Sequence, residues 1–255
     1  MINLDGYGYS ILVSGGIITV SISLASLLVA CVLGMFAALA RLSNNKITSS
    51  IAFGYTTIIR GVPDLVLMLL IFFGGQVFVN NLPENLLNFT AWFGEVIGVG
   101  DSLKVTAEPY LDWGYIDINP FIAGVLTIGF IFGAYMGETF RGAIMAVDRG
   151  MLEAGTAYGM TKFQINRRIL FPQMVRHALP GIGNNWLVLM KASAITSIIG
   201  LEDMVRKAGL AAGATRQPFK FYLTAAIAFL ILTTLSIWIL KIIEKRYSAG
   251  VRSAL

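Results

Sequence analysis

The chain has 255 residues, of which 56% are hydrophobic and only 13% are charged, and its formal net charge is +5. Soluble domains have about 45–50% apolar and about 25% charged residues. This composition therefore argues against a soluble enzyme or a nucleic-acid-binding module, and it predicts a lipid environment. A single cysteine, Cys31, and a single histidine, His177, exclude an internal disulfide framework and a metal site of paired Cys or His ligands.

Five apolar segments are long enough to cross a bilayer, whose hydrocarbon core requires about 20 helical residues. They are 11–40, 51–79, 121–140, 181–201 and 221–240. We therefore expect residues 1–255 to form a single all-α transmembrane domain with five spans.

The second span contains the run Arg60-Gly61-Val62-Pro63-Asp64. Proline removes a helical hydrogen bond and disfavours the helical conformation of the residue before it. This span is expected to be discontinuous, and its freed backbone groups then need a protein or water-filled neighbour.

Basic residues indicate the orientation of the chain, because cytoplasmic loops are enriched in Lys and Arg. With the N-terminus outside, eleven basic residues lie inside and five lie outside. The inside set is Arg41, Lys46, Arg149, Lys162, Arg167, Arg168, Arg176, Lys241, Lys245, Arg246 and Arg252, and the outside set is Lys104, Arg206, Lys207, Arg216 and Lys220. The sequence thus predicts a periplasmic N-terminus and a cytoplasmic C-terminus.

Two connecting segments differ in charge. Segment 80–120 is acidic, with Glu84, Glu95, Asp101, Glu108, Asp112 and Asp117 against Lys104 alone. It is interpreted either as a solvated periplasmic loop or as an external docking surface. Segment 142–180 is basic, is expected to be helical, and lies on the cytoplasmic side, where a structured loop suggests a binding partner.

Small residues recur every four positions in two spans. They are Ser26, Ala30, Gly34 and Ala38 in the first span, and Gly129, Gly133 and Gly137 in the third. Such stripes let helix backbones approach closely in lipid. We expect helix packing here, with a surface that lets helices slide during function as the alternative.

The cytoplasmic segment carries a motif of known spacing. Glu153-Ala154-Gly155 is followed by three residues, Gly159, nine residues, and then Ile169-Leu170-Phe171-Pro172. This pattern resembles the EAA signature of the permease subunits of bacterial ABC importers, with Gly155 in place of the second alanine and Phe171 in place of leucine. The run around Pro63, Glu138 with 141–144, and residues 189–193 are similar to the polar-amino-acid branch, which includes permeases for histidine, lysine, arginine and ornithine.

The resemblance implies a five-helix bundle of the type I importer permease class in the bacterial inner membrane, with an ATPase-coupling helix that contains Glu153, Ala154, Gly155, Ala157 and Gly159. The chain has no Gly-x-x-x-x-Gly-Lys-[Ser/Thr] motif with which to bind ATP phosphates. The partners that the resemblance implies are a pair of cytoplasmic ATP-binding cassette subunits, a second permease chain that is either a copy or a homologue, and a periplasmic amino-acid-binding protein. No enzymatic activity, cofactor or nucleic acid is expected.

Charged residues within the spans are candidate substrate ligands, because a charge at that depth costs at least about 2.5–3.5 kcal/mol and needs a partner or water. They are Arg60, Asp64, Glu138, Arg141 and Lys191. We expect Asp64 and Glu138 to face the positive groups of a cationic amino acid, with Arg60 and Lys191 as further substrate ligands. The structural alternatives are Lys191 paired with Glu138, Glu138 paired with Arg141, Arg60 paired with Asp64, and Asp64 as a helix cap.

Two other functions compete with an importer subunit that works by alternating access. An ion-coupled secondary transporter or channel could use Asp64, Glu138 and Lys191 as a relay, although five spans are an unusual number for its two-repeat designs. A membrane enzyme is disfavoured, because no nucleophile and base occur in a recognisable frame.

Overall fold

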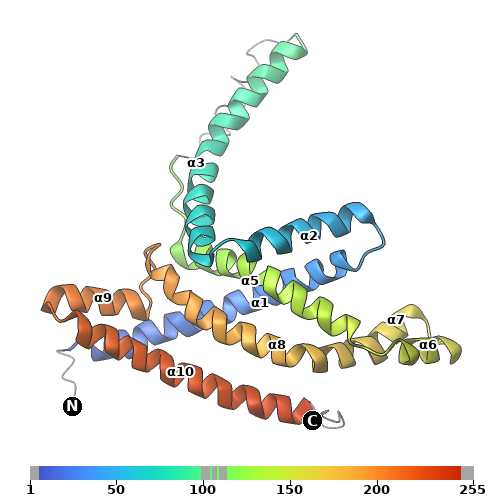
Figure 1. Ribbon diagram of the computed structural model, residues 1–255. Coiled ribbons are helices and arrows are strands. Elements are labelled where there is room, and N and C mark those ends of the chain that lie inside the picture. The colour runs from blue at the N-terminus through green and yellow to red at the C-terminus, as the bar shows by residue number, and fades with distance from the viewer. Residues whose placement is uncertain (1–5, 99–103, 105–107, 109–113, 248–255) are drawn as a thin grey trace.

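The computed structural model describes residues 6–98, 104, 108 and 114–247, and the regular elements among them are helices, with no β-strand. The first elements are η1 (Ser10–Gly15), α1 (Gly16–Arg41), α2 (Lys46–Gly61) and α3 (Asp64–Val96). They are followed by α5 (Pro120–Met145), α6 (Arg149–Ala157), α7 (Lys162–Ile165), η2 (Asn166–Leu170) and α8 (Phe171–Ala192), and then by η3 (Ser193–Ser197), α9 (Met204–Thr215) and α10 (Pro218–Tyr247). Figure 1 shows α1, α5, α8 and α10 as an elongated bundle, with α6 and α7 at one end and α9 at the other.

Four helices within the described residues are long and apolar enough to cross a membrane: Ser10–Arg41, Asp64–Val96, Pro120–Met145 and Pro218–Tyr247. The all-helical membrane fold is therefore confirmed. The expected span 181–201 differs, because it consists of the second half of α8 and the short η3. Arg176, His177, Asn184, Asn185 and Lys191 make α8 too polar to count as a fifth apolar span.

The expected span 51–79 is divided between two helices, at the place where the proline predicted a break. Val62 is extended, with φ −107° and ψ 140°, and α3 begins directly after Pro63. In Figure 1, α3 then leaves the bundle at a steep angle to α2. Only 11% of the most apolar 18-residue stretch of α3 is buried, so most of this helix is left for lipid or other molecules to cover.

Segment 80–120 differs from the expected loop, because α3 continues through Pro83 to Val96. The polar residues Gln76 and Asn80 of α3 bind the segment that returns to the bundle at residues 116–118. The Ile116 N–H donates to Asn80 Oδ1 at 2.7 Å, and the Ile118 N–H donates to Gln76 Oε1 at 3.2 Å. Asp101 and Asp112 of the predicted acidic segment lie outside the described residues, as does Arg252 of the charge count.

The centre of the bundle is the contact between α1 and α5, as the stripes of small residues predicted. A Cβ atom added to Gly34 would lie 2.4 Å from the Cβ of Met136 and 2.9 Å from the Gly137 nitrogen. At Gly129 the same atom would lie 2.5 Å from a methyl carbon of Val29. Backbones thus touch where larger residues would separate the helices.

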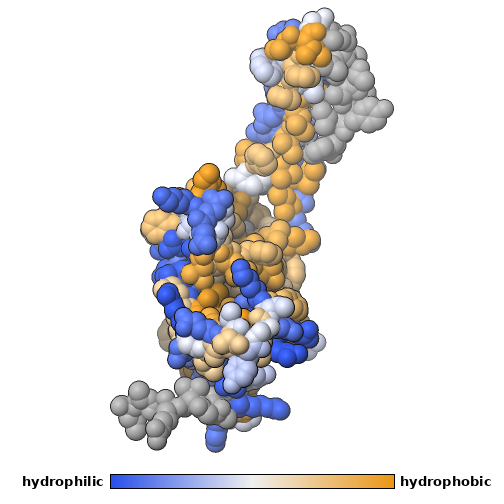
Figure 2. Space-filling model, turned by 90° about the vertical axis from the view of Figure 1, so that its right-hand side faces the viewer, coloured by the Kyte–Doolittle hydropathy of each residue, from blue (hydrophilic) through white to orange (hydrophobic). Residues whose placement is uncertain are grey.

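Polarity is distributed unevenly over the surface. In Figure 2, hydrophobic residues cover much of the exposed side of α3, whereas hydrophilic residues gather over the end of the bundle that carries α6 and α7. The bundle of α1, α5, α8 and α10 therefore has one polar end, which is the end that carries the segment expected on the cytoplasmic side.

Candidate functional site

A cavity of about 380 Å³ opens between α1, α2 and α5 and brings charged groups together. It is lined by Arg41, Phe53, Thr56, Thr57, Arg60, Gly61 and Glu138. Two of the four predicted substrate ligands, Arg60 and Glu138, therefore share one cavity. The cavity offers both signs of charge, as the binding of a zwitterion requires.

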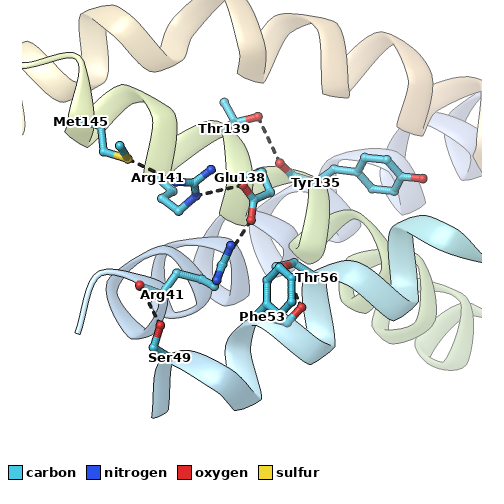
Figure 3. Close-up of polar contacts among 9 residues, drawn as sticks. All are labelled: Arg41, Ser49, Phe53, Thr56, Tyr135, Glu138, Thr139, Arg141 and Met145. Carbon is cyan, nitrogen blue, oxygen red and sulfur yellow. Dashed lines mark hydrogen bonds and ion pairs between the residues drawn. The ribbon is translucent and has the colours of Figure 1, made fainter. Parts of the chain in front are cut away.

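Glu138 is the carboxylate at the centre of an ion-pair cluster (Figure 3). Its Oε2 atom lies 2.8 Å from Arg141 Nη2 and accepts a hydrogen bond from Arg141 Nε at 2.9 Å, and its Oε1 atom lies 3.5 Å from Arg41 Nε. The predicted Glu138–Arg141 pair, three residues apart on one helix, is confirmed. Because the Glu138 side chain is 18% exposed, the carboxylate can still meet a ligand from the cavity.

The break between α2 and α3 places Arg60 and Asp64 around an aromatic residue of α5. The Tyr135 hydroxyl donates to Asp64 Oδ1 at 3.4 Å, and the Arg60 guanidinium carbon lies 5.7 Å from the centre of the Tyr135 ring. No Arg60–Asp64 ion pair forms in the part of the chain that the structure describes, because α2 ends at Gly61 and the chain changes direction before Asp64. Asp64 is the first residue of α3, where its charge favours the helix dipole, and Pro63 occupies the cap position.

Lys191 lies apart from this cluster. It is exposed in the last turn of α8 and lines a separate cavity of about 240 Å³ together with Val205 of α9 and Tyr222 and Phe229 of α10. The suggested Lys191–Glu138 ion pair is not present, since Glu138 pairs with the two arginines and Lys191 faces the neighbouring helices α9 and α10.

The EAA segment forms the short helix α6, which Asp148 caps by accepting a hydrogen bond from the Gly150 N–H at 2.8 Å. Glu153, expected near the helix start, is the fifth residue of α6, beyond the first turn. Its side chain is exposed beside a cavity of about 280 Å³ that Lys162 and Asn166 also line. The helix dipole therefore contributes less at Glu153 than its predicted position implied.

The small residues of this segment divide between two surfaces. Gly155 is buried, and a Cβ atom there would lie 2.9 Å from Ile169 Cδ1 and 3.2 Å from Ile165 Cγ1, so its lack of a side chain lets α6 pack on its own chain. Ala154 and Ala157 are exposed, and so is Gly159, which ends the helix with a φ of +73°. The outward face of α6 is thus available to a partner.

Sequence reasoning missed two residues of the cavity region. Tyr135 precedes Glu138 by three residues on the same helix, so the spacing that predicted the Glu138–Arg141 pair also placed Tyr135 near Glu138. Arg41 was considered only as a topological charge, and its distance from Glu138 along the sequence gave no signal. Among residues 6–98, 104, 108 and 114–247, no three His, Cys, Asp or Glu side chains gather as metal ligands would.

A bundle of apolar helices with a charged, open cavity and a short exposed helix at its polar end defines a membrane-embedded transport subunit. The chain belongs to the family of binding-protein-dependent transport system inner membrane components, whose sequence model matches residues 30–249. The resemblance drawn from the EAA segment is thereby confirmed.

Relatives in this family match almost the whole chain. The histidine/lysine/arginine/ornithine transport system permease protein HisQ of Escherichia coli is 45% identical over 97% of this chain and 98% of its own. The octopine transport system permease protein OccQ of Rhizobium radiobacter is 36% identical over 97% and 94%, and the arginine ABC transporter permease protein ArtQ of Escherichia coli is 35% identical over 92% and 94%.

Solved structures show the same fold. A crystal structure of an amino acid ABC transporter with histidines superposes with a TM-score of 0.71 at 29% identity, covering 92% of this chain and 94% of that one. An inward-facing structure of the MetNI methionine ABC transporter superposes with a TM-score of 0.62 at 16% identity, covering 93% and 96%, and supports the fold alone.

Proposed function

We propose that this chain is the permease subunit of an ATP-driven importer of cationic amino acids, such as histidine, arginine, lysine or ornithine, in the bacterial inner membrane. The main observation behind this proposal is the charged cavity between α1, α2 and α5. Arg60, which lines the cavity, lies over the ring of Tyr135, and the Tyr135 hydroxyl bonds to the Asp64 carboxylate. The named substrates of HisQ and ArtQ support the same class of substrate. The subunit works by alternating access, with its N-terminus in the periplasm.

Each substrate group has a counterpart near the cavity. Asp64 and Glu138 face the positive groups of the amino acid, and Arg60, together with Arg41, faces its carboxylate. Lys191 remains a predicted ligand or gate residue at its separate position between α8, α9 and α10. Charge-assisted hydrogen bonds of this kind contribute about 1.5–3 kcal/mol each.

The energy comes from a separate pair of ATP-binding cassette subunits that receive α6 in a surface groove. The exposed residues Glu153, Ala154, Ala157 and Gly159 form the contact, while Gly155 fixes α6 to its own chain. A second permease chain faces this one across the pathway and covers the exposed side of α3. A periplasmic amino-acid-binding protein delivers the substrate.

Asp64→Asn tests the substrate assignment in vesicles reconstituted with the ATPase, the facing permease and the binding protein. The amide keeps the size of the side chain but removes its charge, so we expect arginine uptake to fall about tenfold, the equivalent of about 1.4 kcal/mol. The ATPase subunit should still co-purify. Asp117→Asn, an exposed site on the 114–118 segment, is the matched control and should transport as the parent does.

Equal arginine uptake by Asp64→Asn and the parent would contradict the role of Asp64. Uptake that proceeds without ATP, driven by an ion gradient alone, would instead support the secondary transporter and remove the importer proposal.

A further inference from the structure

A second hollow lies on the outside of the bundle, away from the charged cavity and from α6. It is an apolar groove of about 750 Å³ between the start of α1 and the first half of α10, which lie side by side in Figure 1. Its walls include Leu12, Ile17, Val20, Ile227, Ile231 and Leu232. Both walls belong to helices with the length and composition of membrane spans, so the groove faces lipid or another membrane-embedded chain.

The length of the groove distinguishes a lipid from a helix of another chain as its occupant. Its lining extends over residues 12–21 of η1 and α1 and over residues 224–232 of α10, which at about 1.5 Å per residue is about 12–14 Å. This is close to half of the hydrocarbon core of about 30 Å. A spanning helix of another chain would need about twice this length of contact, whereas an acyl chain occupies the depth of one leaflet.

The groove ends where its two helices separate. Further along α1, Gly34 packs against Met136 of α5, and further along α10, Leu240 packs against Gly183 of α8. The lining stops at Ser21 and Leu232 on this side, and Met204 of α9 bounds the groove at its other end, so the groove opens sideways, where Ile17 and Ile231 are exposed.

A cation lies at the α9 end of the groove. The Lys207 ammonium donates to the Ser14 hydroxyl at 2.6 Å, and Ser14 adjoins Val13 of the groove lining. An ammonium has three donors, so two are left for a ligand. Asp203, one turn before Lys207, accepts from the Arg206 N–H instead, and within the described part of the chain no carboxylate forms an ion pair with Lys207.

We propose that this groove binds one anionic phospholipid, with an acyl chain along the apolar walls and the headgroup phosphate on Lys207. A lysine ammonium donates charge-assisted hydrogen bonds to phosphate oxygens, and a lipid supplies the phosphate and the apolar chain in one molecule. The occupant is a lipid rather than a free phosphate ion, because the ion leaves the apolar walls uncovered.

Native mass spectrometry of the full chain with its co-purifying subunits tests the proposal by titration with phosphatidylglycerol and with phosphatidylethanolamine. We expect tighter binding of phosphatidylglycerol. Lys207→Gln should weaken it about fivefold, since each basic residue contributes about 1 kcal/mol at such a surface. Gly16→Phe should weaken it at least tenfold, because open space surrounds the Cβ position at Gly16 and the ring fills the groove.

Gly74→Phe in α3 is the matched control, since its Cβ position is equally open but lies on another helix, and it should bind phosphatidylglycerol as the parent does. Equal binding of the two lipids, or unchanged binding by either groove variant, overturns the proposal. Competition by millimolar inorganic phosphate assigns Lys207 to a soluble anion and overturns it as well. So does a Gly16→Phe variant that loses the facing permease while retaining the lipid, because a protein helix is then the occupant.

Discussion

At the scale of single residues, buried polar groups account for most of the specific geometry. Glu138 lies between two arginines that come from two different helices, Arg41 from α1 and Arg141 from α5. Asp203 is fully buried at the start of α9, where its Oδ1 atom accepts from the Arg206 N–H at 2.8 Å and its Oδ2 atom has no hydrogen-bond partner. Both carboxylates are held in place, but only Glu138 is balanced by opposite charge.

Asp203 makes the stability of the protein depend on pH. Burial raises the pKa of Asp203 to about 6, against the opposing effect of the backbone N–H groups at the start of α9. Its usual value is about 3.9, so between about pH 4 and pH 6 the folded state binds more protons than the unfolded state. Stability therefore falls as the pH rises through this window, and the loss is complete above it.

Asp203→Asn should remove this dependence while its amide oxygen still caps α9. We expect the Tm of the variant in mild detergent to exceed that of the parent at pH 7.5, with the difference shrinking toward pH 4. Asp148→Asn replaces an exposed cap of α6 and serves as the control. A constant difference in Tm between Asp203→Asn and the parent at every pH would show that this carboxyl does not titrate in the window.

At the scale of elements, the sequence predicted those helix boundaries that depend on neighbouring residues alone. Pro63 predicted the break between α2 and α3, because ring geometry acts on its nearest neighbours whatever the tertiary structure. The continuation of α3 to Val96 was not predictable from Asn80, Asn81 and Pro83, because these residues favour a loop in isolation. Here Asn80 instead bonds to the chain returning at Ile116, a partner 36 residues away.

The end of α6 depends on one backbone conformation. Gly159 has a φ of +73°, and the Met160 N–H that follows it donates to the Gly155 carbonyl at 3.0 Å. A side chain in this left-handed region costs about 1–2 kcal/mol. Gly159→Ala should therefore speed amide hydrogen exchange across 149–160 severalfold and weaken retention of the ATPase subunit.

Gly142→Ala is the control for this substitution, because Gly142 lies inside α5 in open space. Unchanged exchange in α6 of Gly159→Ala would mean that the turn tolerates a side chain. Faster exchange with full retention of the ATPase would instead place the coupling contact elsewhere.

At the scale of the whole molecule, the bundle depends on the contact between α1 and α5. The stripes of small residues predicted which faces meet, because close packing in lipid requires them on both helices. The face of α8 that carries Lys191 was not predictable, since the rotation of a polar helix is set by its neighbours. For the same reason the pairing of Arg41 with Glu138 became visible only in the folded chain.

Gly34→Ala should loosen this contact. The added methyl would lie 2.4 Å from the Met136 Cβ and 2.9 Å from the Gly137 nitrogen, so the helices must move apart. Overpacking of this kind costs about 1–3 kcal/mol, and the variant should show a lower Tm in mild detergent. Gly16→Ala on the same run of helix meets no atom within 4 Å and should not lower the Tm. Equal values of Tm for Gly34→Ala and the parent would contradict the tight contact.

The direct meeting of two backbones also determines where this molecule can flex. At Gly34 and Gly137 hardly any side-chain atoms lie between α1 and α5, so there are few rotamers that could absorb a displacement. The two helices must therefore move together as one rigid unit. Large rearrangements then require hinges outside this unit, namely the extended Val62–Pro63 connection and the turn at Gly200, where φ is +97°. The charged cavity borders the Val62–Pro63 hinge, since Gly61 lines it, so a rotation of α3 about Pro63 would change the distance between Asp64 and Glu138.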